Sequence, residues 1–265
     1  MHDGICVLIP AFNDNLLIKR CIESVMAAGV DARHIYIVDD ASTDETRDVV
    51  WGFTGVNLLV NQLSLGKTAG IAEAIAHFQL AERYEYLAIL DAGSHVATNY
   101  FTEILVRFLE YPEAVLVSGT PQSENQNWMT AYRAYEYALM LRLYRLAQHV
   151  MTVAPGSASV YRTRALHQLD WISDVDLTVQ IRQQRLGRIV FAPHAVTYTQ
   201  DPRSFRDYVG ELTRWYRGTW QVMRFFSRRQ AAQWFGINRD NSQDIGATAA
   251  ERALLVRDVH QSIWR

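Results

Sequence analysis

The chain has 265 residues, of which 49% are hydrophobic and 20% are charged, and its formal net charge is -2. This length fits one large α/β domain, and this apolar content excludes an intrinsically disordered chain. A net charge this close to zero gives no global electrostatic reason to expect a polyanionic partner. The two cysteines, Cys6 and Cys21, lie in apolar patterns, which predicts buried thiols and a reducing compartment.

Neither an export signal nor a membrane span is predicted. The first four residues lead directly into an apolar strand pattern, without the basic and apolar order of a signal peptide. The most apolar long segment, residues 131–154, is interrupted by four charged side chains and is too polar to cross a bilayer. We therefore expect a soluble, cytoplasmic protein.

The first half of the chain alternates apolar runs with helical patterns. Residues 5–9, 35–38 and 86–90 are short, continuous apolar runs, which indicates strands that are covered on both faces. Helical periodicity over residues 16–27 and 68–79 separates them. This alternation predicts a doubly wound, mostly parallel α/β sheet whose ligand crevice lies at the carboxyl ends of the strands.

The second half of the chain has a different pattern. A long helical pattern covers residues 128–149, a helix is predicted over 175–186, short strands near Ile189 and Val196, and a helix over 204–226. We expect this half to build the acceptor side of a binding site.

No shift in composition separates the halves. We predict one domain over residues 1–237, with a nucleotide-binding half (1–120) and an acceptor half (121–237). A polar linker and a short helical tail follow over residues 238–265.

Polar residues follow each predicted strand. The three groups are Pro10-Ala11-Phe12-Asn13-Asp14, Asp39-Asp40-Ala41-Ser42-Thr43-Asp44 and Asp91-Ala92-Gly93-Ser94-His95. Asp39 and Asp40 are candidates to accept hydrogen bonds from a base or ribose, and Asp44 is a candidate helix cap. Ordinary turn chemistry explains these groups equally well when each is taken alone.

Two further carboxylates are candidates for chemistry. Asp91 either binds a divalent cation that offsets the charge of a diphosphate leaving group or is an ordinary loop residue. Asp174, which follows Ser173, either deprotonates an acceptor hydroxyl or only caps the helix that begins there. The residues alone leave these alternatives open.

The motifs follow one another in a recognisable order. They are Pro10-Ala11-Phe12-Asn13, Asp39 to Asp44, Gly66-Lys67, Leu90-Asp91-Ala92, Pro155-Gly156-Ser157, Ser173-Asp174-Val175-Asp176-Leu177 and Arg214-Trp215. From about Ile5 to Gln221 this order resembles the family 2 inverting glycosyltransferases of the GT-A fold. It is similar to the catalytic domain of the branch that includes poly-N-acetylglucosamine, hyaluronan and cellulose synthases, whose members usually carry transmembrane helices.

The resemblance implies a role for each matching residue. The nucleotide base and ribose would be surrounded by Pro10, Ala11, Asn13, Asp39 and Asp40, with Lys67 near the nucleotide. Asp91 would be the first aspartate of the DxD motif, where the family binds Mg²⁺ or Mn²⁺, and Asp174 would be the general base. The diphosphate and the acceptor would be contacted by Arg214 and Trp215, and Arg217 is a further candidate for this contact.

Three positions depart from the family pattern. Gly93 stands where the DxD motif has its second carboxylate, which puts the divalent cation in doubt, and His95 or His194 is the substitute ligand to consider. Ser173 replaces a glutamate. Glu211 replaces the glutamine of the QxxRW motif, and a carboxylate there repels a diphosphate unless a cation or an arginine such as Arg214 or Arg217 intervenes.

The carboxyl-terminal segment is rich in arginine. Lys19 and Lys67 are the only lysines, so 26 minus 2 leaves 24 arginines, and eight of these fall between Arg203 and Arg239 among aromatic residues. A packed helix, a nucleic-acid groove and a membrane interface all fit this composition. We take residues 204–229 as a candidate peripheral contact with a membrane.

The leading hypothesis is an inverting transfer of one sugar from a nucleotide diphosphate donor, UDP above others, to an acceptor hydroxyl. The acceptor is left open as a glycan, a lipid-linked sugar or a nucleic acid. One alternative is a glycosyltransferase that acts on a modified nucleic-acid base, which the Arg-rich segment motivates. Another is a non-catalytic nucleotide-sugar-binding subunit, which Gly93, Ser173 and Glu211 motivate.

Overall fold

The computed structural model of the protein describes residues 4–124, 159–169 and 174–200, together with the helical residues 131, 135, 206, 208–210 and 213. Within these ranges, only the backbone is described at residues 168, 174–176 and 179. The chain divides into two compact units, Met1–Asp201 and Pro202–Arg265. The whole of the described sheet lies in the first unit.

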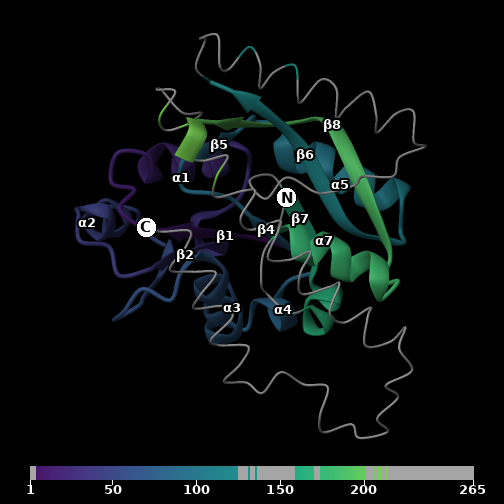
Figure 1. The fold of residues 1–265 in the computed structure, drawn as a ribbon, viewed down its shortest axis with the longest axis horizontal. Coiled ribbons are helices and arrows are strands. Elements are labelled where there is room, and N and C mark those ends of the chain that lie inside the picture. The colour runs from purple at the N-terminus through teal and green to yellow at the C-terminus, as the bar shows by residue number, and fades with distance from the viewer. Residues whose placement is uncertain are drawn as a thin grey trace, which may run out of the picture. The chain divides into compact units, whose positions relative to one another are not determined.

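Eight strands of the described part form one sheet in the order β3-β2-β1-β4-β7-β6-β8-β5 (Figure 1). Strands β3, β2, β1 and β4 run parallel, β7 is antiparallel to both neighbours, and β8 is parallel to β6 and antiparallel to β5. Their bounds are β1 Ile5–Ala11, β2 Ile35–Asp39, β3 Asn57–Val60, β4 Tyr86–Ile89, β5 Ser94–Val96, β6 Ala114–Ser123, β7 Ser159–Arg162 and β8 Arg188–Thr199. The predicted mostly parallel sheet is confirmed.

Helices flank the sheet and include three of the predicted ones. α1 forms because Ile18, Cys21, Ile22 and Val25 recur at helical spacing and are all buried on one face. The helix predictions over 16–27, 68–79 and 175–186 are confirmed by α1, α3 and α7. The helices are α1 Ile18–Ala27, α2 Thr46–Trp51, α3 Lys67–Phe78, α4 Leu80–Arg83, α5 Tyr100–Glu110 and α7 Asp174–Gln183, with 3-10 turns at Ala32–His34 and Thr163–Gln168.

The core consists of two apolar clusters, one on each face of the sheet. Alternate residues of β1 divide between them: Val7 packs in the cluster with α1 and α5, whereas Leu8 packs in the cluster with α3 and α7. Cys6 and Cys21 are free and buried in opposite clusters, and burial raises the pKa of both thiols. The prediction of buried thiols is confirmed.

The two short strands predicted near Ile189 and Val196 are one strand, β8. Pro193 and the exposed His194 interrupt its apolar pattern, and the pairing with β6 shifts register between Ser118 and Thr120 at the same level. Because proline has no N–H to donate to the ladder, a bulge at this point lets the strand continue past it. The sequence pattern therefore indicated two pieces where the chain has one.

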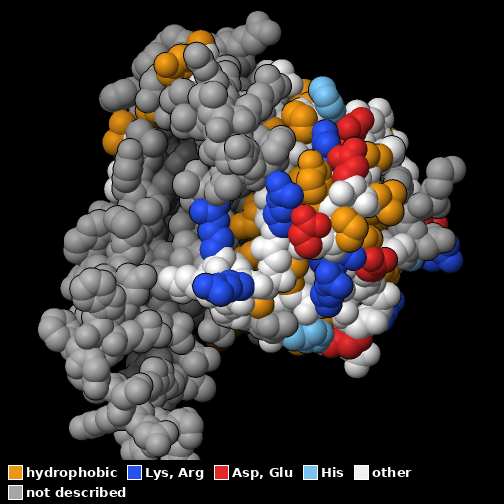
Figure 2. All heavy atoms as spheres, turned by 90° about the vertical axis from the view of Figure 1, so that its right-hand side faces the viewer, with side chains coloured by type: hydrophobic (Ala, Val, Ile, Leu, Met, Phe, Trp, Pro, Cys, Tyr) orange, Lys and Arg blue, Asp and Glu red, His pale blue; other side chains and the backbone are white. Residues whose placement is uncertain are grey.

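The described surface mixes charges of both signs. Arg107 pairs with Glu110, and Arg188 pairs with Glu113. Figure 2 shows acidic and basic side chains interspersed with apolar ones on the face to the right of Figure 1. Among the residues described, no helix is both long and apolar enough to cross a membrane.

The predicted helices over 128–149 and 204–226 fall largely outside the described residues. The described positions within them, residues 131, 135, 206, 208–210 and 213, are helical. The predicted linker and tail over 238–265 lie entirely outside the described ranges.

The register shift between β6 and β8 leaves no room for a side chain at Gly119. A Cβ added there would lie 2.5 Å from the Ala195 carbonyl oxygen and 2.8 Å from the Tyr100 ring. Gly119→Ala is therefore expected to lower the free energy of unfolding by about 1–3 kcal/mol, measured by urea denaturation. Gly4→Ala is the control, because its Cβ would meet only Glu85 Cβ, at 4.0 Å. Equal losses in the two variants would contradict the steric argument.

Candidate active site

The carboxyl ends of β1, β2 and β4 meet at one edge of the sheet. The Asp40 N–H donates to the Ala11 carbonyl at 2.9 Å, and the Leu90 N–H donates to the Leu8 carbonyl at 3.1 Å. The polar groups that follow these strands are therefore neighbours. The structure thus brings Pro10, Ala11, Asn13, Asp39, Asp40 and Asp91 to the same edge, as the parallel topology requires.

The loops after β1 and β2 are locked together by hydrogen bonds. Asn13 has a left-handed backbone (φ 56°), its N–H donates to Ser42 Oγ at 2.9 Å, and its Oδ1 accepts the Thr43 N–H at 2.8 Å. Asp44 Oδ1 accepts the N–H of Thr46, the first residue of α2, although Glu45 and not Asp44 occupies the N-cap position of this helix. Asn13 thus holds the two loops together in a left-handed backbone conformation, which asparagine tolerates better than most residues.

Asp39 retains an unused acceptor inside the protein. Its side chain is fully buried, and Oδ2 accepts from Arg47 Nε at 2.7 Å and from the Ser42 N–H at 3.3 Å. Its other oxygen, Oδ1, is buried and has no hydrogen-bond partner in the described part of the chain. Buried carboxylate oxygens are rarely left without a donor, so this atom is an unsatisfied acceptor next to the edge of the sheet.

Asp40, in contrast, is saturated by the protein itself. Oδ1 accepts from Asn61 Nδ2 at 3.0 Å and from the Leu65 N–H at 2.8 Å, and Oδ2 accepts from Ser64 Oγ at 2.7 Å and from the Gly66 N–H at 2.6 Å. These four bonds use the four lone-pair positions of the carboxylate. Asp40 therefore holds the loop that precedes α3.

Lys67 and Asp91 form an ion pair at this edge of the sheet. Lys67 begins α3 directly after the loop that Asp40 holds, and its Nζ lies 2.7 Å from Asp91 Oδ1. The two side chains are 31% and 39% exposed, so a ligand can reach both. The sequence predicted that Lys67 lies near the nucleotide and that Asp91 binds a cation. In the structure these two side chains contact each other.

The described residues do not supply a divalent-cation site around Asp91. Its carboxylate is engaged by an ammonium group, the third position of the motif is Gly93, and no cluster of three or more metal-ligating side chains occurs in the ranges described. His95 Nε2 lies 3.1 Å from an Arg20 nitrogen, and burial, followed by the Arg20 charge, lowers the pKa of His95. His194 is exposed on β8 and belongs to no such cluster among those residues.

Asp174 is the first residue of α7. The helix is anchored by Leu177 and Ile181, which are buried one turn apart in the cluster with α3. The role predicted for Asp174 as general base stays a prediction, because only its backbone is described. Ser173, Glu211, Arg214, Trp215 and Arg217 lie outside the described residues.

Asp14 is a site residue that the sequence did not single out. Its Oδ2 accepts the Phe12 N–H at 2.9 Å. Burial raises the pKa of Asp14 to about 6, although the hydrogen bond from Phe12 acts to lower it. The negative charges of Asp91, Asp44 and Asp39 add to the rise. In sequence it is one more aspartate in a turn, and only the folded chain gathers these like charges.

A family model described as "Glycosyltransferase like family 2" matches residues 2–218. The chain belongs to this glycosyltransferase family. Similar curated proteins are the poly-beta-1,6-N-acetyl-D-glucosamine synthases of Staphylococcus aureus (strain COL), 24% identical over 231 residues, and of Staphylococcus epidermidis, 23% identical over 237 residues. The matches cover 83% of this chain and 56% of each relative, so the chain spans about half the length of these synthases.

Solved structures share the fold of this glycosyltransferase-family chain. The mannosyltransferase PcManGT from Pyrobaculum calidifontis, in complex with GDP-Man and Mn²⁺, matches with a TM-score of 0.61 and 17% identity, over 80% of this chain and 61% of that one. Glucosyl-3-phosphoglycerate synthase from Mycobacterium tuberculosis, in complex with Mn²⁺, UDP and phosphoglyceric acid, matches with a TM-score of 0.59 and 15% identity. This match covers 83% of the present chain and 76% of the synthase. S. aureus TarS 1-349 in complex with UDP-GlcNAc matches with a TM-score of 0.53 and 14% identity, over 76% of this chain and 59% of TarS. At these identities the likeness establishes the fold.

The pKa of Asp14 predicts how its charge affects stability. A carboxyl whose folded pKa is raised costs stability above that pKa, so the penalty is complete above about pH 6 and absent below about pH 4. Asp14→Asn is expected to raise the free energy of unfolding at about pH 7.5 by roughly 1–3 kcal/mol, because the amide still accepts from Phe12 and carries no charge. Urea denaturation of the variant and of the unaltered protein at about pH 7.5 and pH 4 measures this gain. A gain in unfolding free energy of the same size at both pH values would contradict the raised pKa of Asp14.

Proposed function

We propose that the chain transfers one sugar from a nucleoside diphosphate donor, UDP above others, to an acceptor hydroxyl with inversion at the anomeric carbon. The observation that carries this proposal is the buried, unpartnered Oδ1 of Asp39, which lies at the same sheet edge as the Lys67–Asp91 pair. A free acceptor for a base and a cation for a diphosphate are the two contacts that such a donor needs. Membership of the glycosyltransferase family supports the proposal.

The base is proposed to bind over the ends of β1 and β2. A carboxylate oxygen only accepts, so Asp39 Oδ1 suits the imide N–H of uracil and opposes the bare ring nitrogen at the same position of cytosine. Pro10, Ala11 and Asn13 would line this part of the crevice. Asp40 would contribute indirectly, because its own acceptors are filled.

The diphosphate is proposed to lie toward Lys67. By the family resemblance, Arg214 and Trp215 would contact the diphosphate and the acceptor, and Arg217 is a further candidate for this contact. The proposed functional domain is residues 1–237. A divalent cation, Mg²⁺ or Mn²⁺, is the family's expected cofactor, and Asp91 is the residue that would hold it. Since the described donors around Asp91 do not fit such an ion, the proposed reaction has no step that passes through it.

The reaction itself is proposed as one displacement. The acceptor oxygen forms a bond to the anomeric carbon while the bond from that carbon to the diphosphate oxygen breaks, and the nucleoside diphosphate leaves with the electron pair. Asp174 takes the proton of the acceptor hydroxyl. Positive groups near the diphosphate stabilise the charge that develops on the leaving oxygen.

The base contact can be tested by nucleotide preference. We expect the protein to bind UDP at least about tenfold more tightly than CDP, because cytosine presents a bare ring nitrogen to Asp39 Oδ1 where uracil presents an N–H. Asp39→Asn should reduce this ratio, since an amide can present either a donor or an acceptor. Asp48→Asn, at an exposed position of α2, is the matched control. Titration calorimetry measures both affinities, and equal binding of UDP and CDP by the unaltered protein would exclude this contact.

The catalytic base can be tested separately from binding. Asp174→Asn is expected to lower sugar transfer by about 100-fold or more while the affinity for UDP changes little, because only proton removal is lost. The neighbouring Asp176→Asn serves as a control on the same helix. Donor consumption and UDP binding are measured on each variant, and full turnover by Asp174→Asn would rule out this role.

A further inference from the structure

Lys67 lies beside the carboxylate to which the family resemblance assigns a divalent cation. Its Nζ lies 2.7 Å from Asp91 Oδ1, so a metal ion at that carboxylate would either displace the ammonium or lie beside a like charge. With Gly93 as the third residue of the motif, one carboxylate is left to hold such an ion. Building on the proposed function, we propose that Lys67 takes the place of the cation and that diphosphate binding does not require a divalent metal.

The position of Lys67 is built into the fold. Gly66, with φ 84° in the region that favours glycine, precedes Lys67 and donates its N–H to Asp40. Asp40 is 4% exposed and fixes the loop through four hydrogen bonds, so the first turn of α3 has a defined start. α3 has 12 residues, and the partial positive charge of its N-terminus adds to that of the ammonium. The ammonium of Lys67, which Asp91 partly neutralises, and the positive end of α3 therefore lie together at the start of this helix.

The backbone conformation does not require a glycine at position 93. The missing carboxylate therefore cannot be explained by the fold alone. A Cβ added at Gly93 would meet only Leu17 Cδ1, at 3.5 Å, which is an ordinary van der Waals contact. The φ of Gly93 lies outside the left-handed region, so other residues are tolerated there. An aspartate would fit at Gly93. Without it, Asp91 is the carboxylate of this motif, and it pairs with Lys67. The residue is thus a place where metal dependence can be introduced.

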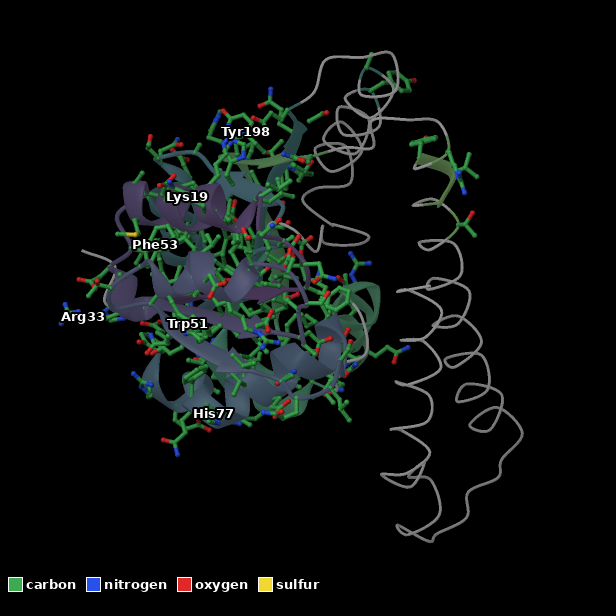
Figure 3. All side chains as sticks on the ribbon, turned by 90° about the vertical axis from the view of Figure 1, so that its left-hand side faces the viewer. Lys19, Arg33, Trp51, Phe53, His77 and Tyr198 are labelled. Carbon is green, nitrogen blue, oxygen red and sulfur yellow. The ribbon has the colours of Figure 1, made fainter. Side chains whose placement is uncertain are left out.

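The first part of the experiment measures UDP binding with EDTA and with Mn²⁺. We expect the unaltered protein to bind UDP with affinities that agree within about threefold in the two conditions. Lys67→Gln should weaken binding in EDTA by at least about tenfold, since it removes the charge that pairs with the diphosphate. Lys19→Gln is the matched control, because Lys19 is the only other lysine and lies 66% exposed on α1 beside Glu23 (Figure 3). It should bind UDP as the unaltered protein does.

The second part converts the site. The double variant Lys67→Gln with Gly93→Asp supplies two carboxylates and no ammonium, so Mn²⁺ is expected to strengthen its UDP binding by at least about tenfold over EDTA. Thermal melts of each variant in the absence of nucleotide confirm that it is folded. A double variant that is folded and gains nothing from Mn²⁺ counts against the proposal.

The outcomes separate this inference from the proposed function. If the unaltered protein binds UDP with Mn²⁺ and loses it in EDTA, Lys67 does not replace the cation, and the proposed function stands. If Lys67→Gln binds UDP in EDTA as well as Lys19→Gln does, the assignment of Lys67 is wrong. If neither UDP nor any other nucleoside diphosphate binds in either condition, the proposed function itself fails, and the inference fails with it.

Discussion

The hydrogen bonding of one buried carboxylate, Asp40, determines the geometry of the candidate site. A charge buried this deeply is costly unless its oxygens are filled by donors, and Asp40 fills all four positions from Asn61 and the loop of Ser64, Leu65 and Gly66. These donors come from the end of β3 and from the approach to α3. One side chain therefore joins three elements, and the start of α3 follows from it.

The elements that could be predicted are those with a long or continuous apolar pattern. β1, β2 and β4 are buried on both faces, so their apolarity is uninterrupted, and α1 shows a complete helical face. Several elements that were not predicted are short or mixed: β5 has three residues, α2 has six, and β6 ends in a polar segment that contains Pro121. The short ones leave no period to detect, whereas α5 was missed although its 11 residues bury an apolar face at helical spacing.

The candidate site was predictable in composition and less so in detail. Asp39 and Asp40 are adjacent aspartates at one strand end, and the sequence assigned them the same contact, yet one has a free acceptor and the other has none. The difference arises from Arg47, which pairs with Asp39, and from Asn61, which is 21 residues from Asp40. Likewise, the pKa of Asp14 is raised first by burial and then by the charges of Asp91 and Asp44, and these causes arise only on folding. Contacts of this kind carry no local signal.

The distribution of charge indicates how a donor would lie in the crevice. Carboxylates gather over the ends of β1 and β2, where Asp14 and Asp39 lie, and an anion bound there would be repelled. Groups that donate hydrogen bonds, such as the N–H of a base and the hydroxyls of a ribose, suit that end. In the proposed function the diphosphate lies toward Lys67 and the N-terminus of α3, which offer positive charge beside the carboxylate of Asp91. The proposed donor therefore has its base over the ends of β1 and β2 and its diphosphate at the start of α3.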